Sequence, residues 1–263
     1  MDQGPEVFAG THPQDLGLGN IRNINDTEQI MTDFGLIRRW QEIKNEIRAI
    51  AQQSGRNPDQ VQLLAVSKGH PGLSIQTLAQ QGQLEFGESY AQEALEKMDS
   101  LQLPRIRWHF IGRLQSNKAK YLAGRFALIH SLDRIKVAQA LHARCQSLKK
   151  TQDVLIQVNI ASDKSKAGLD TKQVYELAQE LEQMQFLQLQ GLMCMPPFYE
   201  DPEQAKEDFA RMRKLKQNLE AHLGRSLPHL SMGMSHDYQQ AIQEGATLIR
   251  IGTRIFGPRK YNS

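Results

Sequence analysis

The sequence predicts an α/β protein that forms a single (β/α)8 TIM-like barrel over residues 27–263. Eight short apolar runs alternate with segments of helical periodicity, which indicates parallel strands joined by right-handed crossovers. An open doubly wound sheet fits the same alternation. The closed barrel is favoured because no glycine-rich dinucleotide-binding motif follows the first apolar run. A chain of 263 residues is long enough for one such barrel and its core.

Residues 1–26 are predicted to be a flexible extension, because they are rich in Gly, Asn, Asp and Pro and show no periodicity. The first helix follows, and its apolar residues are spaced three and four apart on one face, namely Leu36, Trp40, Ile43, Ile47 and Ile50. Asn57 and Pro58 end this periodic segment. Residues 61–68 (VQLLAVSK) form an apolar run of the length expected for a buried strand.

Strands and helices continue to alternate through the middle of the chain. The next three predicted strands are LEFGE (84–88), IRWHFIG (106–112) and FALIHSLD (126–133). Helices are expected at residues 72–81, 89–98 and 116–123, and in the segment whose apolar side carries Ile135, Ala138 and Leu141. This half of the chain therefore supplies four strands in total.

The second half of the chain supplies the other four strands. They are VLIQVNIA (154–161), LQLQGLMCM (187–195), HLSMG (229–233) and TLIRIGT (247–253). One helix between them has an apolar face made of Val174, Leu177, Ala178, Leu181 and Met184. After Pro196 and Pro197, a longer helix has a face made of Ala205, Phe209, Met212, Leu219 and Leu223. A short helix is expected at residues 236–244.

The composition argues against several classes of function. Charges of both signs are mixed along the chain to a net +3, without the dense basic stripe of a nucleic-acid-binding protein. No run of ~18 apolar residues is present to span a membrane, and the first residues lack the pattern of a secretory signal. The two cysteines, Cys145 and Cys194, show no metal-type spacing. We therefore expect a cytoplasmic protein, a monomer, without a metal site.

In a barrel of this kind, the functional groups lie at the carboxyl ends of the strands. Lys68 closes the first apolar run, where partial burial lowers the pKa of a lysine and frees its amine to attack a carbonyl. A solvated lysine at a strand end is the alternative. Ser231, Gly233 and Ser235 follow the seventh strand and precede a helix, which favours phosphate binding, although Ser235 also fits an N-cap.

The eighth strand ends in a second group of candidate residues. Gly252 permits close backbone approach and Thr253 adds a hydroxyl where barrels commonly bind phosphate, the alternative being a turn glycine beside a surface threonine. By alternation Arg250 points into the barrel, where it needs a partner, and both a salt bridge and a ligand contact fit. His109 fits a core histidine better than a ligand-binding one. Asn159 is placed to line the barrel mouth.

Eight blocks of the sequence, taken in order, resemble the pyridoxal phosphate homeostasis protein family over about residues 30–260. The blocks are AVSK (65–68), FGESY with Gln92 and Glu93 (86–93), WHFIGRLQSNK (108–118), HSLD (130–133), NIASDKSKAGL (159–169), GLMCMPP (191–197), LSMGMSHD (230–237) and IRIGTRIFG (249–257). Together they make a specific signal, unlike any one block alone.

The resemblance implies a barrel like the N-terminal domain of alanine racemase, with pyridoxal 5′-phosphate (PLP) held covalently as an aldimine on Lys68. It also implies that Arg250 faces the pyridine nitrogen and that Lys166 lies near the mouth. The residues implied around the phosphate are Ser231, Ser235, Gly252 and Thr253. The other implied cofactor contacts are Met232, Asn159 and Ser89.

The sequence departs from the family pattern at two places near the implied cofactor. Ser89 replaces an asparagine that faces the cofactor in the family, so this contact differs here. Gly69, His70 and Pro71 stand where the family often has a Thr-Lys-Pro run, so a second lysine in this loop is missing.

These residues lead to three hypotheses about function. A guanidinium only donates hydrogen bonds, so Arg250 would keep the pyridine nitrogen unprotonated and weaken PLP as an electron sink. The chain ends ten residues after its eighth predicted strand, so we expect it to lack the C-terminal domain that supplies a second base in racemases. We therefore expect a PLP carrier that buffers PLP, maintains vitamin B6 and amino-acid homeostasis, and passes PLP to apo-enzymes without robust catalysis. The alternatives are a racemase-like PLP enzyme and a Schiff-base aldolase without PLP.

Overall fold

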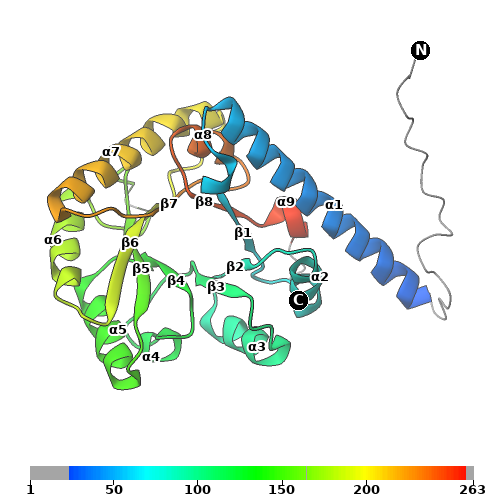
Figure 1. The fold of residues 1–263 in the computed structure, drawn as a ribbon, viewed down its shortest axis with the longest axis horizontal. Helices are drawn as coiled ribbons and strands as arrows, with labels where there is room; N and C mark the ends of the chain where they lie inside the picture. The colour runs from blue at the N-terminus through cyan, green and yellow to red at the C-terminus, as the bar shows by residue number, and fades with distance from the viewer. Residues whose placement is uncertain (1–23, 164, 259–263) are drawn as a thin grey trace, which may run out of the picture.

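A computed structural model of the protein describes residues 24–163 and 165–258, with side chains from residue 33 onward. Its strands are parallel and close into a barrel in the order β1 to β8, which confirms the predicted fold class (Figure 1). β8 pairs with β1, and Leu64 lies opposite Arg250. The strands are β1 (Gln62–Val66), β2 (Glu85–Glu88), β3 (Arg107–Phe110), β4 (Leu128–Leu132), β5 (Gln152–Val158), β6 (Leu187–Cys194), β7 (His229–Ser231) and β8 (Leu248–Ile251).

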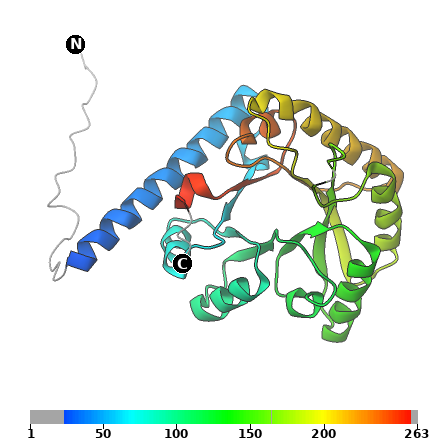
Figure 2. The same cartoon turned by 180° about the vertical axis from the view of Figure 1, so that it is seen from behind.

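Helices surround the barrel and connect its strands, as Figures 1 and 2 show from opposite sides. They are α1 (Ile24–Gln53), α2 (Gly72–Gln80), α3 (Ala91–Leu101), α4 (Ala119–Leu122), α5 (Ile135–Leu148), α6 (Thr171–Glu182), α7 (Ala205–Leu223), α8 (Tyr238–Gln243) and α9 (Thr253–Phe256). Two short 3-10 helices are η2 (Pro58–Gln60) and η3 (Pro202–Gln204). No helix in the described part of the chain is long and apolar enough to cross a membrane.

The first helix, α1, covers the seam where β8 meets β1. It begins at Ile24, so residues 24–26 belong to this helix and not to the predicted extension, whereas residues 1–23 lie outside the described residues. Trp40 Nε1 donates to Gln83 Oε1 (2.9 Å), and Gln83 Nε2 donates to the Leu63 carbonyl oxygen (2.9 Å). These bonds tie α1 to β1. The N-terminal part of α1 extends beyond the barrel in both views (Figures 1 and 2).

Two differences from the predicted boundaries lie at the barrel mouth. β1 ends at Val66, before Lys68, because the chain turns there and the His70 backbone N–H donates to the Ser67 carbonyl oxygen (3.0 Å). β8 ends at Ile251, so that Thr253 begins α9 rather than ending a strand. Lys68 therefore lies in the loop after β1 and Thr253 in the first turn of α9, and both side chains lie at the mouth.

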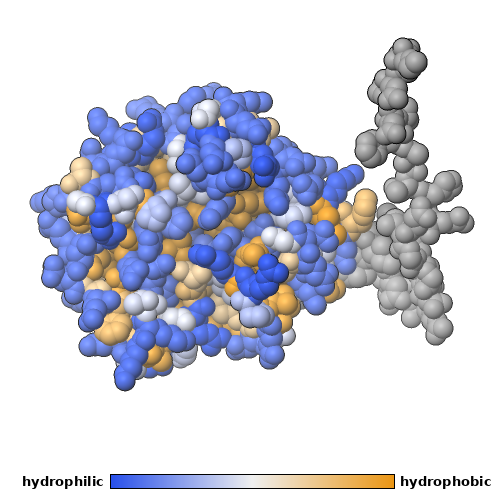
Figure 3. Space-filling view, viewed as in Figure 1, coloured by the Kyte–Doolittle hydropathy of each residue, from blue (hydrophilic) through white to orange (hydrophobic). Residues whose placement is uncertain are grey.

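The apolar residues form two separate layers. The larger layer lies between the strands and the surrounding helices, where α5 buries Val137, Ala138 and Leu141 but leaves Ile135 39% exposed, contrary to the predicted helix face. The smaller layer lies inside the barrel and consists of Leu128, Leu155, Met193 and Leu248, with Met195 packed against it. Figure 3 shows a mostly hydrophilic surface with apolar residues gathered toward the middle of this face.

Candidate functional site

A cavity of about 170 Å³ lies at the carboxyl ends of the strands. It brings together five residues that were selected from the sequence, namely Lys68, Ser235, Arg250, Gly252 and Thr253. The other lining residues are apolar, namely Val66, Ile111, Met193, Met195 and Met234. One amine, one guanidinium and two hydroxyls therefore line a small and otherwise apolar space.

Lys68 lies in the turn after β1, and both of its neighbours are held by carboxylates. The Ser67 hydroxyl donates to Glu88 Oε1 (2.7 Å), and the Gly69 backbone N–H donates to Glu93 Oε1 (2.7 Å). Gly69 has a φ of +72°, a left-handed conformation that glycine adopts without a steric penalty. These contacts fix the backbone on either side of Lys68 and so set the direction from which its side chain enters the cavity.

Lys97 on α3 completes the support of this turn. Its Nζ donates to the Ser67 carbonyl oxygen (2.9 Å), Glu88 Oε1 (2.7 Å) and Glu93 Oε1 (2.6 Å). Glu88 is fully buried, and its second oxygen, Oε2, has no hydrogen-bond partner among the described residues. Burial raises the pKa of Glu88, whereas Lys97 and Ser67 act in the opposite direction. Sequence reasoning gave this cluster no role, although the four-residue spacing of Glu93 and Lys97 indicates a helical ion pair.

Arg250 is buried beside the cavity and is held by two neutral acceptors. Its Nη1 donates to Ser231 Oγ (2.7 Å) and its Nη2 to the Cys194 carbonyl oxygen (2.9 Å). Within the described ranges, no carboxylate forms an ion pair with Arg250, so the structure does not support the salt-bridge alternative. A guanidinium has five N–H groups, so donors remain for a ligand in the cavity.

Ser231 lies deeper than its expected position beside a phosphate. Its hydroxyl is fully buried, accepts from Arg250, and lies 2.9 Å from His130 Nδ1. Both contacts of this hydroxyl are with the protein, so the structure places Ser231 beneath Arg250 and not on the cavity wall. His130 was not selected from the sequence, because its partner Ser231 is 101 residues away along the chain.

Ser235 and Thr253 bring two hydroxyls to the rim of the cavity. Thr253 Oγ1 lies 3.4 Å from Ser235 Oγ, which joins the loop after β7 to the start of α9. At Gly252, a Cβ atom would lie 3.2 Å from the Val66 carbonyl oxygen, so the two chain segments approach closely there. Hydroxyls beside closely packed backbone are an arrangement that suits an anionic group.

Three other predicted site residues have side chains away from the cavity lining. Met232 is fully buried in the layer between the strands and the helices. Asn159 closes its own loop, since its Nδ2 donates to the Asp163 carbonyl oxygen (2.8 Å) and its Oδ1 accepts from the Asp163 backbone N–H (3.0 Å). Ser89 follows β2, and its backbone packs against Gly112, where any Cβ atom would collide with it.

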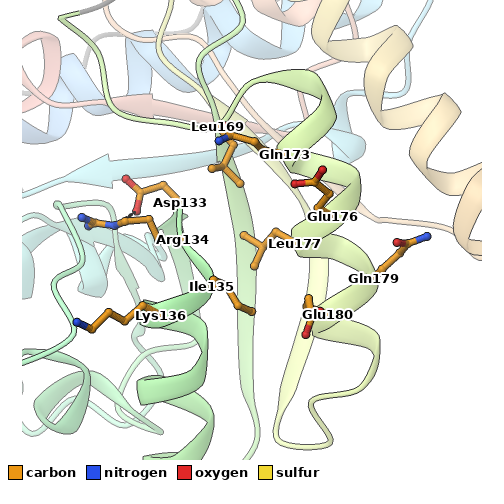
Figure 4. A pocket seen from close by; sticks show the side chains of 10 residues that line it. All are labelled: Asp133, Arg134, Ile135, Lys136, Leu169, Gln173, Glu176, Leu177, Gln179 and Glu180. Atoms are coloured by element: carbon orange, nitrogen blue, oxygen red, sulfur yellow. Dashed lines mark hydrogen bonds and ion pairs between the residues drawn. The ribbon is translucent and has the colours of Figure 1, made fainter.

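Further hollows lie outside this cavity, and two of them bear on the candidate site. A smaller one of about 80 Å³ shares Met234 with it and is lined by Lys166, which was expected near the mouth. A larger groove of about 600 Å³ lies between α5 and α6 and contains none of the predicted site residues (Figure 4). Its charged side chains, including Arg134 and Glu176, surround an apolar floor that includes Leu177 (Figure 4). No group of His, Cys, Asp or Glu suited to holding a metal ion is found among residues 24–163 and 165–258.

Comparison with known families and proteins gives a consistent result. Residues 39–260 match the family described as "Alanine racemase, N-terminal domain". The chain is 40% identical over 223 residues to the pyridoxal phosphate homeostasis protein of Aquifex aeolicus. This alignment covers 85% of this chain and 98% of that protein. It is 44% identical over 224 residues to the protein of the same name from Vibrio alginolyticus, covering 84% and 96% of the two chains.

Solved structures show the same fold. PipY of Synechococcus elongatus with PLP bound is 37% identical, with a TM-score of 0.72 over 80% of this chain and 99% of that one. An alanine racemase of Clostridium difficile has a TM-score of 0.67 over 87% of this chain and 60% of that one, at 12% identity, which shows the fold alone. The matches confirm the family resemblance that the sequence blocks indicated.

Proposed function

Because this chain belongs to the pyridoxal phosphate homeostasis protein family, we propose that it binds PLP at the barrel mouth and buffers the cellular supply of this cofactor, without robust catalysis of its own. The observation that supports the proposal is the cavity that Lys68 and Arg250 line together with two hydroxyls. Relatives with this family name and a PLP-bound solved structure support the same ligand.

The residues of the cavity match the chemical groups of PLP one by one. Lys68 offers an amine for the aldehyde, which would hold the cofactor covalently as a Schiff base. Arg250 offers donors for the ring nitrogen, and Ser235 and Thr253 offer hydroxyls for the phosphate. Val66, Ile111 and Met193, with Met195 and Met234, give the apolar walls that a planar ring requires. Three other residues were expected to contact PLP, namely Ser89, Asn159 and Met232. They would reach it through their backbone or after a local rearrangement.

Arg250 is the residue that argues against strong catalysis. When bound, PLP stabilises carbanions as an electron sink, and an acidic partner at its ring nitrogen strengthens that effect. Arg250 only donates hydrogen bonds and stays charged. Its contacts with Ser231 and Cys194 hold the buried guanidinium in position. It would therefore hold the ring nitrogen as a hydrogen-bond acceptor and disfavour its protonation.

We place the protein in the cytoplasm as a monomer, with apo PLP enzymes as the recipients of its cofactor. A hydrogen-bonded phosphate and a reversible bond to Lys68 allow release of the ligand, which a carrier requires. The racemase-like alternative has the shared fold as its support, and the aldolase alternative has only the amine of Lys68.

Carrier and enzyme are separated by one experiment on the PLP-loaded protein. It is mixed with L- and D-amino acids, and racemisation, decarboxylation and transamination are followed; in parallel, it is mixed with an apo PLP enzyme whose recovered activity reports transfer. We expect transfer together with turnover far below the usual enzyme range of about 1–10³ s⁻¹. Turnover within that range on any amino acid contradicts the carrier function.

A further inference from the structure

A chain of hydrogen bonds runs through the barrel interior from Arg250 to the opposite end of the strands. Ser231 Oγ lies 2.9 Å from His130 Nδ1, and His130 Nε2 lies 2.9 Å from His109 Nδ1. His109 Nε2 then lies 2.5 Å from Glu85 Oε2, at the start of β2. We call Glu85, His109, His130 and Ser231 the interior chain. Its histidines and serine are buried, whereas the Glu85 side chain is 18% exposed.

The carboxylate at one end fixes the direction of every bond in the interior chain when both rings are neutral. Glu85 accepts from His109 Nε2, so His109 Nδ1 accepts and His130 donates to it from Nε2. His130 Nδ1 then accepts from the Ser231 hydroxyl, whose oxygen accepts from Arg250. Both histidines are neutral in this arrangement. Each member is satisfied, which holds Ser231 as the acceptor beneath Arg250.

One added proton on the two histidines reverses this direction. With protons on both of its nitrogens, His109 donates to His130 Nε2, so His130 must donate from Nδ1 to Ser231. Ser231 then accepts from both His130 and Arg250, and its own hydrogen loses the partner it had. The net change is one proton from solvent: the proton on His130 Nε2 moves to His109 Nδ1, and His130 gains a proton on Nδ1. Any share of the added charge on His130 is opposed by Arg250, which is a buried cation.

The charged groups around the interior chain differ between its two ends. Burial lowers the pKa of His130 well below its usual value, and His109, Arg250 and His229 act in the same direction. Other charged groups at the Glu85 end are Arg107, which pairs with Glu85 at 3.2 Å, and Asp153 on β5. The contact of the histidine pair with a carboxylate is at His109 Nε2, 2.5 Å from Glu85 Oε2.

We propose that the interior chain consists of positioning residues for Arg250, and that uptake of one proton by its two histidines reverses the chain and loosens the contact of Arg250 with its ligand. The inference rests on the proposed function, because that ligand contact is with the ring nitrogen of PLP. It adds to that function a dependence of PLP binding at the mouth on the protonation of histidines near Glu85, at the other end of the barrel.

The first test needs no PLP. In the ligand-free, full-length protein labelled with 15N, the imidazole nitrogen shifts of His109 and His130 report which nitrogens carry protons. At neutral pH we expect both rings to be neutral with the proton on Nε2. A charged ring, or a proton on Nδ1 of either one, overturns the proposal.

The second test removes the charge at the far end while keeping an acceptor for His109. In Glu85→Gln, the amide oxygen can still accept from Nε2, but the carboxylate no longer stabilises a protonated pair. The acid titration of the two histidines should move to lower pH by about one unit. Asp153→Asn is the matched control, since Asp153 accepts from Gln190 (3.2 Å) and is not part of the interior chain. Equal shifts in the two variants contradict the proposal.

The third test uses PLP. Ser231→Ala removes the acceptor beneath Arg250, and we expect the dissociation constant of PLP to rise about tenfold and the visible band to change in wavelength. Ser131→Ala is the matched control, because its buried hydroxyl donates to the Gly112 carbonyl oxygen instead. His130→Gln can both donate and accept, so it should retain most of the affinity. Equal affinity in wild type and Ser231→Ala overturns the positioning role.

These measurements separate the inference from the proposed function. Absence of PLP binding by the wild-type protein defeats the proposed function and the ligand contact that depends on it. The histidine signals of the ligand-free protein decide the direction of the interior chain independently of that result.

Discussion

At the scale of single residues, Lys97 is the side chain whose removal should be most costly near the site. It donates to two carboxylates and one carbonyl oxygen, and one of its partners, Glu88, is fully buried. Leaving a buried charge without its partner costs about 3–5 kcal/mol. We therefore expect Lys97→Met to lower the free energy of unfolding by about 3 kcal/mol, as measured by urea denaturation.

The Lys97 prediction has an internal control. In the double variant Lys97→Met/Glu88→Gln, the buried partner is neutral, so a large part of the lost stability should return. A loss in Lys97→Met below about 1 kcal/mol, or no recovery in the double variant, contradicts a buried ionic cluster around the Lys68 turn.

His130 should make the stability of the protein depend on pH. Burial lowers its pKa in the folded state well below the value of 6.5 that it has when exposed. Below that value the unfolded chain binds a proton that the folded protein does not, so stability is present above 6.5 and is lost as the pH falls. The slope is about 1.4 kcal/mol per pH unit for one such group.

Urea denaturation at a series of pH values between about 6.5 and 5 checks this dependence. His130→Gln should remove the contribution of His130 to the slope. His142→Gln is the matched control, because His142 lies on α5 outside the barrel interior and its ring packs near Phe186. Identical slopes in wild type and His130→Gln would show that His130 titrates normally in the folded protein.

At the scale of elements, α1, α8 and α9 are joined by one cluster of polar side chains. Tyr238 on α8 donates to Glu46 on α1, and Arg254 on α9 donates to Tyr238 Oη (2.7 Å) and to Glu46 Oε1 (3.0 Å). Burial, with the hydrogen bond to Glu46, raises the pKa of Tyr238 to about 12. Because α9 begins at Thr253, this cluster also supports one wall of the cavity.

Tyr238→Phe tests the link between these helices and the cavity. The variant leaves Glu46 and Arg254 with one partner fewer, and we expect the free energy of unfolding to fall by about 1–2 kcal/mol and the affinity for PLP to fall with it. Urea denaturation and absorbance titration measure the two effects. Tyr175→Phe on α6, whose ring packs against His222, should change neither. A loss of stability without any loss of affinity means that α9 is held by other contacts.

The order of elements could be predicted from the sequence because it depends on local patterns. Apolar runs of strand length are visible within a few residues, and all eight strands follow from them. The residues at which the strands end could be predicted less accurately. The turn after β1 depends on contacts of Ser67 and Gly69 with Glu88 and Glu93, which lie on later elements.

The candidate site could be predicted only in part, for the same reason. Lys68 and Arg250 could be found because strand ends and alternation are local features. His130 could not, since its partners His109 and Ser231 lie on other strands that only the folded barrel brings near. For Lys97, only the ion pair with Glu93 could be predicted, because Ser67 and Glu88 lie on other elements. Ser231 was assigned to the phosphate because its neighbouring residues are small, and the structure shows that alternation turns its hydroxyl into the interior beneath Arg250.

At the scale of the whole molecule, closure of the barrel is what makes the site. All eight strands are parallel, so their carboxyl ends meet at one mouth. β8 pairs with β1, so Lys68 from the start of the sequence lies beside Arg250 and Thr253 from its end. An open sheet with the same strands would leave β1 and β8 without this pairing. Covalent binding of PLP by Lys68 at this mouth is therefore the central prediction.

The visible absorbance spectrum of the protein titrated with PLP tests that claim most directly. The wild-type protein should develop the visible band of a PLP Schiff base, and borohydride should fix the cofactor to the chain. Lys68→Ala should show neither effect, whereas Lys136→Ala, in the groove between α5 and α6, should behave as wild type. A band of equal intensity in Lys68→Ala, or no band in the wild-type protein, contradicts the account.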